Sequence, residues 1–450
     1  MENKFATVAL VQSQKKQSDD ITTEEVKNMV RETVKLAGGL SFIKDGQTVV
    51  LKPNLISTRA ITGQIAPMRM AMPYADAYKD DSKIIPKEAN GITSDYRIAM
   101  ELATMIREVN PSGKLYIMES SGDGSTTKNL ELMGYVKANF PQVDEIISLD
   151  YTGDTYRNVN ASDIVGIDAP KDQKYKKLAS WMNNKYYFDK KYYESDVVIS
   201  LTCLKNHQNA GFTGGIKNIA IGVMPQQIYR SFKNGTVNRG MAISHEFYAL
   251  GNFMHDYYAL KPADFVFVDG LSGLAYGPAC QGAPSYNAAK MNMRLMMASK
   301  DIIANDTIGA LIVGVNPRSM LYMKSLADKG IGTTDLTRII VKGNIRVDQI
   351  KKPFPTPSGL LGTVFKIPDG VFYANYNAPK AELKSVIVED GKLKATLNVG
   401  SEVIKVEIYN GSELVDVITN NFSLIDIEFS GSSGTLIAYD DLLNATVLTF

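Results

Sequence analysis

Short runs of β-branched and apolar residues recur along the first 350 positions of this 450-residue chain, and longer segments with a helical period separate them. Strands that alternate with amphipathic helices are typical of a parallel sheet covered by helices. Residues 22–39 and 98–109 are the clearest helix predictions, because apolar residues recur there at helical spacing and the second segment ends before Asn110–Pro111. The fold class predicted is therefore α/β, with a mainly parallel sheet flanked by helices. Strands are predicted at 6–12, 48–54, 114–120, 145–150, 196–201, 264–270 and 338–343.

The character of the chain changes after residue 350. Residues 351–380 are rich in proline and predict an extended linker or wrapping segment. Residues 381–450 contain short alternating runs, and the dipeptides Asp390–Gly391 and Asn410–Gly411 favour hairpin turns. This pattern predicts a small all-β sandwich of the immunoglobulin or fibronectin type, which is either a packing or spacer module or a binding module for glycan or protein. The domains predicted are 1–350, 351–380 and 381–450.

The charge balance limits the classes of partner. With 49 basic and 48 acidic residues the formal net charge is +1, so no global field attracts nucleic acid or an anionic membrane. The chain as given shows no signal-peptide pattern and no apolar run near the roughly 20 residues that span a bilayer. A cytoplasmic location is the default prediction, and an extracytoplasmic one applies if a signal has been removed. Two cysteines cannot supply four thiolates, so a built-in iron–sulfur cluster is not expected.

The densest group of chemically active residues lies at 202–225, after the strand predicted at 196–201. Ligands of parallel sheets bind just outside the carboxyl ends of the strands, which is where this segment begins. Cations, an imidazole and an amide bracket bare glycine backbone there, a combination that favours a phosphate or carboxylate site over a tight turn with solvated lysines. The candidate residues are Lys205, His207, Gly214, Gly215, Lys217 and Asn218.

The other two histidines of the chain, His245 and His255, lie close together in the sequence. Ten residues of helix rise about 15 Å, so the two rings cannot ligate one ion from a straight helix. We expect His245 to be the partner of His207, and His255 to be a satisfied helix histidine. Asp269 ends the strand predicted at 264–270, where a carboxylate is placed either for proton transfer or metal binding or for capping a loop.

Further candidates follow other strands. Lys52 and Asn54 end the second predicted strand, and Glu119 ends the third. Ser120 and Ser121 come next in a hydroxyl-rich turn, which predicts either an oxyanion cradle or simple helix capping. The carboxylates that are candidates for a divalent metal are Glu119, Asp269 and Asp306. Cys203 and Cys280 both fall in candidate site loops, although buried, inert thiols are the favoured interpretation.

Several separated motifs, taken in order, resemble the domain of unknown function 362 family. They include VVLKPNL, IMESSGDGS, SDVVISLTCLKNHQNAGFTGGIKNIAIGVMP, ADFVFVDGLSGLAYGPACQG and MASKDIIANDTIGALI, and the resemblance covers about residues 5–345. It implies an α/β domain that is sometimes found beside ferredoxin-like modules and sometimes exported, and the family name carries no activity. Here Leu201–Thr202–Cys203 replaces the usual proline-rich strand end. The motif falls on Lys52, Asn54, Lys205, His207, Thr213, Lys217, Asn218, His245, Asp269, Gly277, Pro278, Asp301 and Asp306.

Taken together, these observations lead to an enzyme hypothesis. The protein is predicted to bind a small anionic metabolite at the strand ends, with Lys52, Lys205 and Lys217 holding phosphate or carboxylate and His207 or His245 acting as general acid or base. A divalent metal is an additional hypothesis. The alternatives are a redox or iron–sulfur-associated partner or maturation protein, and a noncatalytic surface or binding protein.

Overall fold

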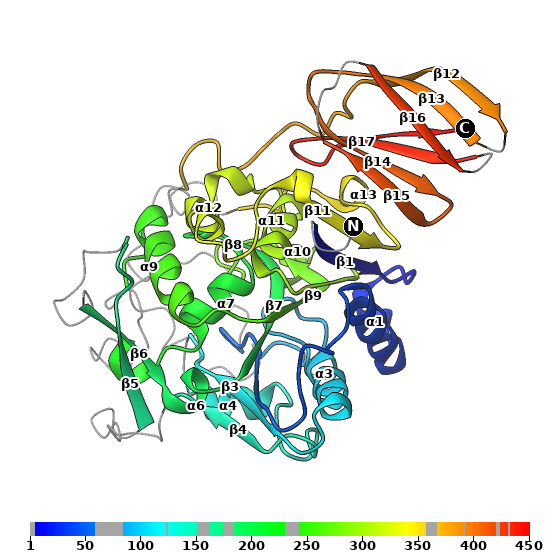
Figure 1. The fold of residues 1–450 in the computed structure, drawn as a ribbon. Coiled ribbons are helices and arrows are strands. Elements are labelled where there is room, and N and C mark those ends of the chain that lie inside the picture. Colours follow the sequence, from blue (N-terminus) through cyan, green and yellow to red (C-terminus); the bar gives the residue numbers. More distant parts are fainter. Residues whose placement is uncertain are drawn as a thin grey trace.

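The computed structural model describes residues 5–58, 84–122, 125–150, 163–174, 184–229, 243–356, 367–390, 392–419, 424–430 and 433–450. Its centre is a nine-stranded sheet in the order β11-β1-β10-β9-β7-β2-β3-β4, with β8 paired to β7 (Figure 1). Only β10 runs against the common direction of the eight strands on this path. The strands are β1 (Ala6–Gln12), β2 (Thr48–Lys52), β3 (Lys114–Glu119), β4 (Glu145–Ser148), β7 (Val197–His207), β8 (Gly211–Thr213), β9 (Phe265–Leu274), β10 (Leu295–Ser299) and β11 (Ile339–Gly343).

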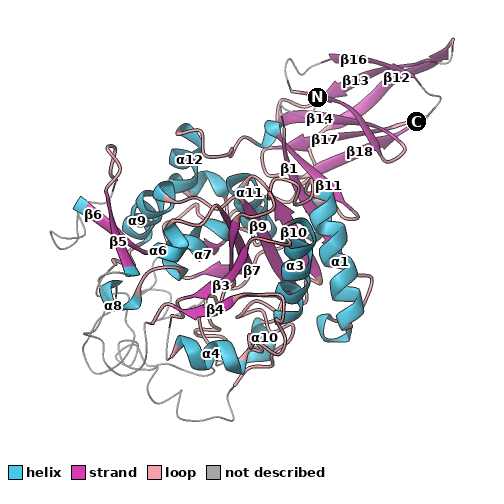
Figure 2. Ribbon diagram, turned by 60° about the horizontal axis from the view of Figure 1, so that its bottom comes forward, coloured by secondary structure: helices cyan, strands magenta, loops and turns pink. Residues whose placement is uncertain are grey.

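Helices cover both faces of this sheet (Figure 2). Successive strand residues point to opposite faces, and Val49 and Leu51 accordingly join the core beneath α1 and α3, whereas Val50 joins the other core. Burial on both faces explains why the strands read as continuous apolar runs. The helices are α1 (Thr23–Leu36), α3 (Tyr96–Val109), α4 (Thr126–Leu132), α6 (Lys190–Tyr193), α7 (Gly215–Gly222), α8 (Gln226–Tyr229), α9 (Phe247–Leu260), α10 (Tyr286–Ala289), α11 (Ile302–Ile312), α12 (Leu321–Asp328) and α13 (Val347–Ile350).

The predicted α/β class with a mainly parallel sheet is confirmed, and three features depart from the sequence prediction. β7 does not end near Leu201 but continues to His207, because β8 folds back and supplies an antiparallel partner. The antiparallel strand β10 lies in a methionine-rich segment that predicted no strand. A separate two-stranded ribbon, β5 (Ile164–Asp168) with β6 (Lys185–Asp189), was not predicted either.

Residues after 380 form two antiparallel sheets, β12-β13-β16 and β15-β14-β17-β18. Apolar side chains of β13, β14, β16 and β17 form one shared core, so the two sheets pack face to face. The immunoglobulin or fibronectin type and the exact domain limits stay predictions. These strands are β12 (Ala381–Glu389), β13 (Lys392–Val399), β14 (Val403–Asn410), β15 (Glu413–Ile418), β16 (Leu424–Ser430), β17 (Thr435–Asp440) and β18 (Ala445–Thr449).

The described parts of the proline-rich segment wrap against the α/β domain. Phe354 and Val371 are buried in its core, and Asn206 donates hydrogen bonds to the carbonyl oxygens of Phe354 and Pro355 at 3.0 and 2.9 Å. Within the part of the chain that the structure describes, no helix is both long and apolar enough to cross a membrane.

Candidate functional site

Lys205 and His207 lie on the extension of β7 beyond its parallel neighbour β2. β2 ends at Lys52, whose register partner on β7 is Ser200, and β7 then continues for seven residues. In this extension Lys205 pairs with Thr213 and His207 with Gly211 of β8. Side chains two residues apart on a strand share a face, so Lys205 and His207 project to the same side.

The ammonium group of Lys205 is fully buried and has only neutral hydrogen-bond acceptors. Its Nζ donates to the carbonyl oxygen of Ile92 at 2.7 Å and to Oδ1 of Asn54 at 3.2 Å. Among the described residues no carboxylate forms an ion pair with Lys205, and burial lowers its pKa. A buried charge without a counter-ion costs free energy, which makes this position unusual for a purely structural lysine.

His207 is held as a neutral imidazole with a defined tautomer. Its Nδ1 accepts hydrogen bonds from the backbone N–H groups of Asn209 and Ala210, at 3.0 and 3.2 Å. Because Nδ1 is an acceptor, the proton of the neutral ring resides on Nε2. Burial lowers the pKa of His207 well below 6.5, and the positive charges of Lys217, His245 and Lys205 lower it further. His207 therefore offers an N–H donor at Nε2.

These electrostatic interactions define a cationic cluster, which we take as Lys205, His207, Lys217 and His245. Lys217 is buried on α7, whereas His245 is exposed just before α9. Asn209 Nδ2 also donates to the carbonyl oxygen of His245 at 3.0 Å, which ties the loop after His207 to the His245 segment. The electrostatic influence on His207 and the contact of Asn209 thus connect basic residues that the sequence placed in two separate segments.

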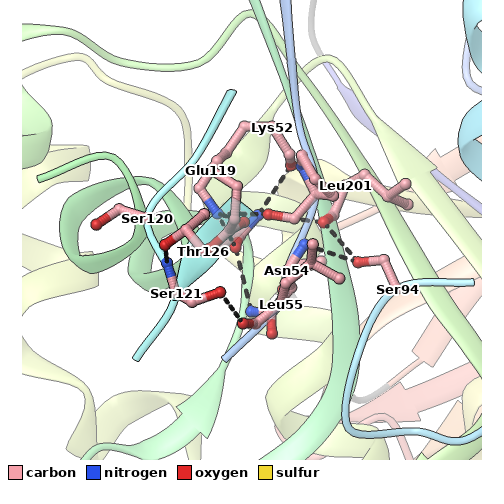
Figure 3. A network of polar contacts seen from close by, with 12 residues as sticks. Lys52, Asn54, Leu55, Ser94, Glu119, Ser120, Ser121, Thr126 and Leu201 are labelled. Atoms are coloured by element: carbon pink, nitrogen blue, oxygen red, sulfur yellow. Dashed lines mark hydrogen bonds and ion pairs between the residues drawn. The ribbon is translucent and has the colours of Figure 1, made fainter. Parts of the chain in front are cut away.

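A second buried group, the Lys52 network, contacts this cluster, because Asn54 Oδ1 accepts a hydrogen bond from Lys205 Nζ. Figure 3 shows polar contacts of Lys52, Asn54 and Glu119 within the network. The members of this network are Lys52, Asn54, Glu119 and Asn218. Lys52 Nζ pairs with Glu119 Oε2 at 2.6 Å, and it also donates to Asn218 Oδ1 at 3.1 Å and to the carbonyl oxygen of Pro53. Lys52 was expected to hold the anion, but its charge is already neutralised by Glu119.

The side chain of Asn218 joins three segments of backbone. Its Nδ2 donates to Ser200 Oγ at 3.0 Å and to the carbonyl oxygens of Lys52 and Leu201 at 3.2 Å. Its Oδ1 accepts from Asn54 Nδ2 at 3.1 Å. Asn218 therefore fixes α7 to the ends of β2 and β7, and its hydrogen-bonding groups are used within the protein rather than left for a ligand.

Ser120 and Ser121 were predicted as an oxyanion cradle, but their hydroxyl groups donate to the backbone. Ser120 Oγ donates to the carbonyl oxygen of Met224 at 2.8 Å, and Ser121 Oγ donates to that of Leu55 at 2.7 Å. The backbone N–H of Ser121 is also occupied, by Thr126 Oγ1 at 2.9 Å. The two serines thus hold neighbouring loops in place (Figure 3).

Asp306 occupies the position where Gly214 and Gly215 were expected to bind an anion through their amides. Its carboxylate accepts from the N–H groups of Gly215 and Ile216 at 2.7 and 2.9 Å, and so caps α7. A Cβ on Gly214 would lie 2.3 Å from the Asp306 Cγ, so this close approach requires glycine. Burial raises the pKa of Asp306 to about 7. The backbone N–H groups in the first turn of α7 therefore already bind a carboxylate of the protein itself.

Asp269 likewise serves the backbone instead of standing free as a catalytic group. Its Oδ2 accepts from the N–H of Asp95 at 2.8 Å and its Oδ1 from that of Leu271 at 3.0 Å. Burial, followed by repulsion from Asp95, raises the pKa of Asp269 to about 7. Asp95 in turn pairs with Arg97 at 2.7 Å and caps α3. The two aspartates fix the loop that presents the Ile92 carbonyl to Lys205.

A metal centre at Glu119, Asp269 and Asp306 does not fit this arrangement. Over the described residues, no group of three or more His, Cys, Asp or Glu side chains is placed to hold a metal ion. The two cysteines fit a thiolate ligand set no better, because both are buried and burial raises the pKa values of Cys203 and Cys280 to about 12. This agrees with the expectation of inert thiols.

His255 differs in part from the expectation of a satisfied histidine. Its Nδ1 lies 2.9 Å from the Asp256 carboxylate, whereas its buried Nε2 has no hydrogen-bond partner among the described residues.

Sequence reasoning missed the Ile92 carbonyl and the side chains of Ser94, Asp95 and Arg97. Only Asp95 carried a usable signal, since an aspartate immediately before an amphipathic helix is a typical N-cap.

Comparison with known proteins identifies the central part of the chain. The family model described as "Domain of unknown function (DUF362)" matches residues 84–311, which confirms the resemblance seen in the sequence motifs. Lys52 and Asn54 and the strands after residue 380 lie outside the matched range. No curated protein matches the chain.

Two solved structures show only distant likeness. One is the lactate racemase apoprotein from Thermoanaerobacterium thermosaccharolyticum, with 11% identity and a TM-score of 0.33 over 68% of this chain and 59% of that chain. The other is the catalytic module of the metalloprotease ZmpA from Clostridium perfringens, with 12% identity and a TM-score of 0.14 over 33% of this chain and 28% of that chain. No functional argument rests on either.

Proposed function

Because the chain belongs to the DUF362 family, whose description assigns no activity, we propose a function from the site itself: the cationic cluster binds a small anionic metabolite through a phosphate or carboxylate group. The observation that carries this proposal is the buried ammonium of Lys205, which contacts only a carbonyl and an amide oxygen. An anion bound there would compensate a charge that the folded chain leaves without a counter-ion.

Burial of the cluster strengthens its binding of anions and limits the charge of the anion that it can bind. Lys205 and Lys217 are both buried, so an anion that reaches them exchanges water for charge-assisted hydrogen bonds in a region of low dielectric. Lys52 adds no net charge because Glu119 neutralises it at 2.6 Å. The ligand charge is therefore matched to Lys205, which fits a phosphate or a carboxylate group.

His207 gives the site a chemical role beyond binding. A neutral ring with its proton on Nε2 cannot take up a proton at that nitrogen, so His207 acts as a hydrogen-bond donor to an oxygen that gains negative charge, rather than as a general base. This narrows the acid–base role expected from the sequence. The class of reaction it favours is one in which a carbonyl or phosphoryl oxygen becomes more negative, and the cluster then supplies the enzyme's electrostatic stabilisation.

The proposal is tested by measuring the melting temperature of the full chain with inorganic phosphate, oxalate and a panel of phosphorylated and carboxylated metabolites. A ligand that binds only the folded state raises the melting temperature as its concentration increases. We expect at least one anion to do so with the wild type and with the control variant Lys128→Met, which removes an exposed lysine. The shift should be lost in Lys205→Met.

Two outcomes would overturn the proposal. One is a panel in which no anion raises the melting temperature, and the other is a shift that persists unchanged in Lys205→Met. Burial raises the pKa of both thiols to about 12 and so disfavours the thiolate that ligates a cluster, which speaks against the redox or iron–sulfur alternative.

A further inference from the structure

The C-terminal sheets and the edge of the main sheet enclose a cleft that is separate from the cationic cluster. β11 is the last strand of the main sheet, and no described strand pairs with its outer edge. Residues Ile340 to Gly343 of β11 line one wall of a cleft of about 1810 Å³, and Leu414 and Val417 of β15 line the other. Figure 1 shows β11 beside β14 and β15 of the C-terminal sheets.

The outer edge of β11 presents backbone groups to this cleft. The N–H of Asn344 donates to Leu10 of β1, and alternation along the strand therefore turns the backbone groups of Lys342 and Ile340 toward β1 as well. Ile339, Val341 and Gly343 then face outward. The contact of the Ile339 carbonyl with Lys405 Nζ at 2.7 Å agrees with this assignment. The N–H and C=O groups of Val341 are thus available to a further strand.

The lining of the cleft carries more basic than acidic side chains. Lys405 is neutralised by Glu407 at 2.8 Å, and Arg346 by Asp348 at 3.0 Å. Arg338 and Lys342, which lie four residues apart at β11, are exposed, and neither forms an ion pair with a described residue. Arg338 ends a short 3-10 helix just before β11 and Lys342 lies within β11, so basic side chains at both ends of this strand can meet acidic side chains of an added strand. The charged lining residues are Lys300, Arg338, Lys342, Arg346 and Lys405 against Asp301, Glu407 and Glu413.

From these observations we infer that the cleft is a docking site for an extended acidic segment of another protein, which adds a strand to β11. Main-chain hydrogen bonds to Val341 and Gly343 would supply affinity, and contacts with Arg338 and Lys342 would select acidic side chains. An unpaired strand edge otherwise invites nonspecific pairing, and β11 limits this by its length of five residues and its lysine. The inference does not depend on the anion proposed for the cationic cluster.

The test is a selection from a displayed library of random peptides of about ten residues, carried out with the full chain. The enriched peptides should be rich in acidic residues. The variant Val341→Pro removes the outward N–H, and proline is tolerated on edge strands, whereas Val341→Ala keeps that N–H. We expect the affinity of the selected peptides to fall about tenfold or more in Val341→Pro and to change little in Val341→Ala.

Two further experiments test the inference even if Val341→Pro fails to fold. Synthetic copies of the selected peptides with N-methyl groups on alternate residues should lose binding in one methylation register only, because only one edge of the peptide pairs with β11. The double variant Arg338→Glu/Lys342→Glu should abolish selection of acidic peptides. The inference is overturned if no peptide is enriched, if enriched peptides bind equally with either methylation pattern, or if polyanionic glycans or a second copy of the chain fill the cleft instead.

Discussion

Lys52 and Lys205 are both fully buried on neighbouring parallel strands, yet their surroundings differ in one decisive respect. Lys52 contacts the Glu119 carboxylate at 2.6 Å, whereas Lys205 contacts only the oxygen atoms of Asn54 and Ile92. Removing the partner of a paired buried lysine lowers the free energy of unfolding, because a buried charge is then left unpaired. A buried lysine that has no counter-ion already lowers the free energy of unfolding. The comparison therefore separates a structural lysine from a candidate site lysine.

The largest effect is expected at the paired lysine. Lys52→Met leaves the Glu119 carboxylate buried without its cation, which should lower the free energy of unfolding by about 3–5 kcal/mol. The double variant Lys52→Met/Glu119→Leu should recover much of this loss, because no charge is then left unpaired. Denaturant unfolding of the two variants and the wild type measures both changes. A double variant no more stable than Lys52→Met would show that the ion pair is not what holds these residues together.

A substitution at Asn54 can give Lys205 a carboxylate partner. Asn54 Oδ1 lies 3.2 Å from Lys205 Nζ, so Asn54→Asp places a carboxylate beside that ammonium. We expect the resulting internal ion pair to compete with the ligand and to weaken anion binding about tenfold, or roughly 1.4 kcal/mol. Titration of the wild type and the variant with the tightest-binding anion of the panel measures the difference. Unchanged affinity would indicate that the anion does not contact Lys205.

The sequence predicted the sheet better than it predicted the site. All seven predicted strands exist, and the central ones are buried on both faces, so that they leave continuous apolar runs that can be read locally. The site depends instead on contacts between distant segments: the Ile92 carbonyl meets Lys205 across 113 residues, and it carries no side-chain signal at all. Asp306 was predicted as a candidate metal ligand, and only the packing of α11 against α7 reveals that its carboxylate caps a helix.

His207 sharpens the comparison through pH, because burial and neighbouring cations lower its pKa well below 6.5 in the folded state. Below pH 6.5 the unfolded chain takes up a proton that folded His207 does not, so the wild type should lose stability relative to His207→Gln as the pH falls. The expected slope of this difference is up to about 1.4 kcal/mol per pH unit. This pH dependence should vanish above pH 7.5, where His207 is unprotonated in both the folded and the unfolded state.

The measurement is denaturant unfolding of the wild type and His207→Gln from pH 5 to pH 8, in which other titrating groups cancel in the difference. Lys128→Met, which removes an exposed lysine and leaves all three histidines in place, is the control. Parallel pH curves for the wild type and His207→Gln would contradict a neutral His207 and, with it, the assignment of Nε2 as a donor.

The smallest change in stability is expected at Lys205 itself. Lys205→Met leaves the oxygen atoms of Asn54 and Ile92 without a donor, which is destabilising, but it also removes a buried ammonium whose desolvation costs several kcal/mol. These terms oppose each other, so we expect the free energy of unfolding to change by no more than about 1 kcal/mol. The same substitution at Lys52 should lower the free energy of unfolding several times more, because it leaves the Glu119 carboxylate buried without a counter-ion. Equal losses at the two lysines, measured by denaturant unfolding without added anion, would mean that Lys205 is as structural as Lys52.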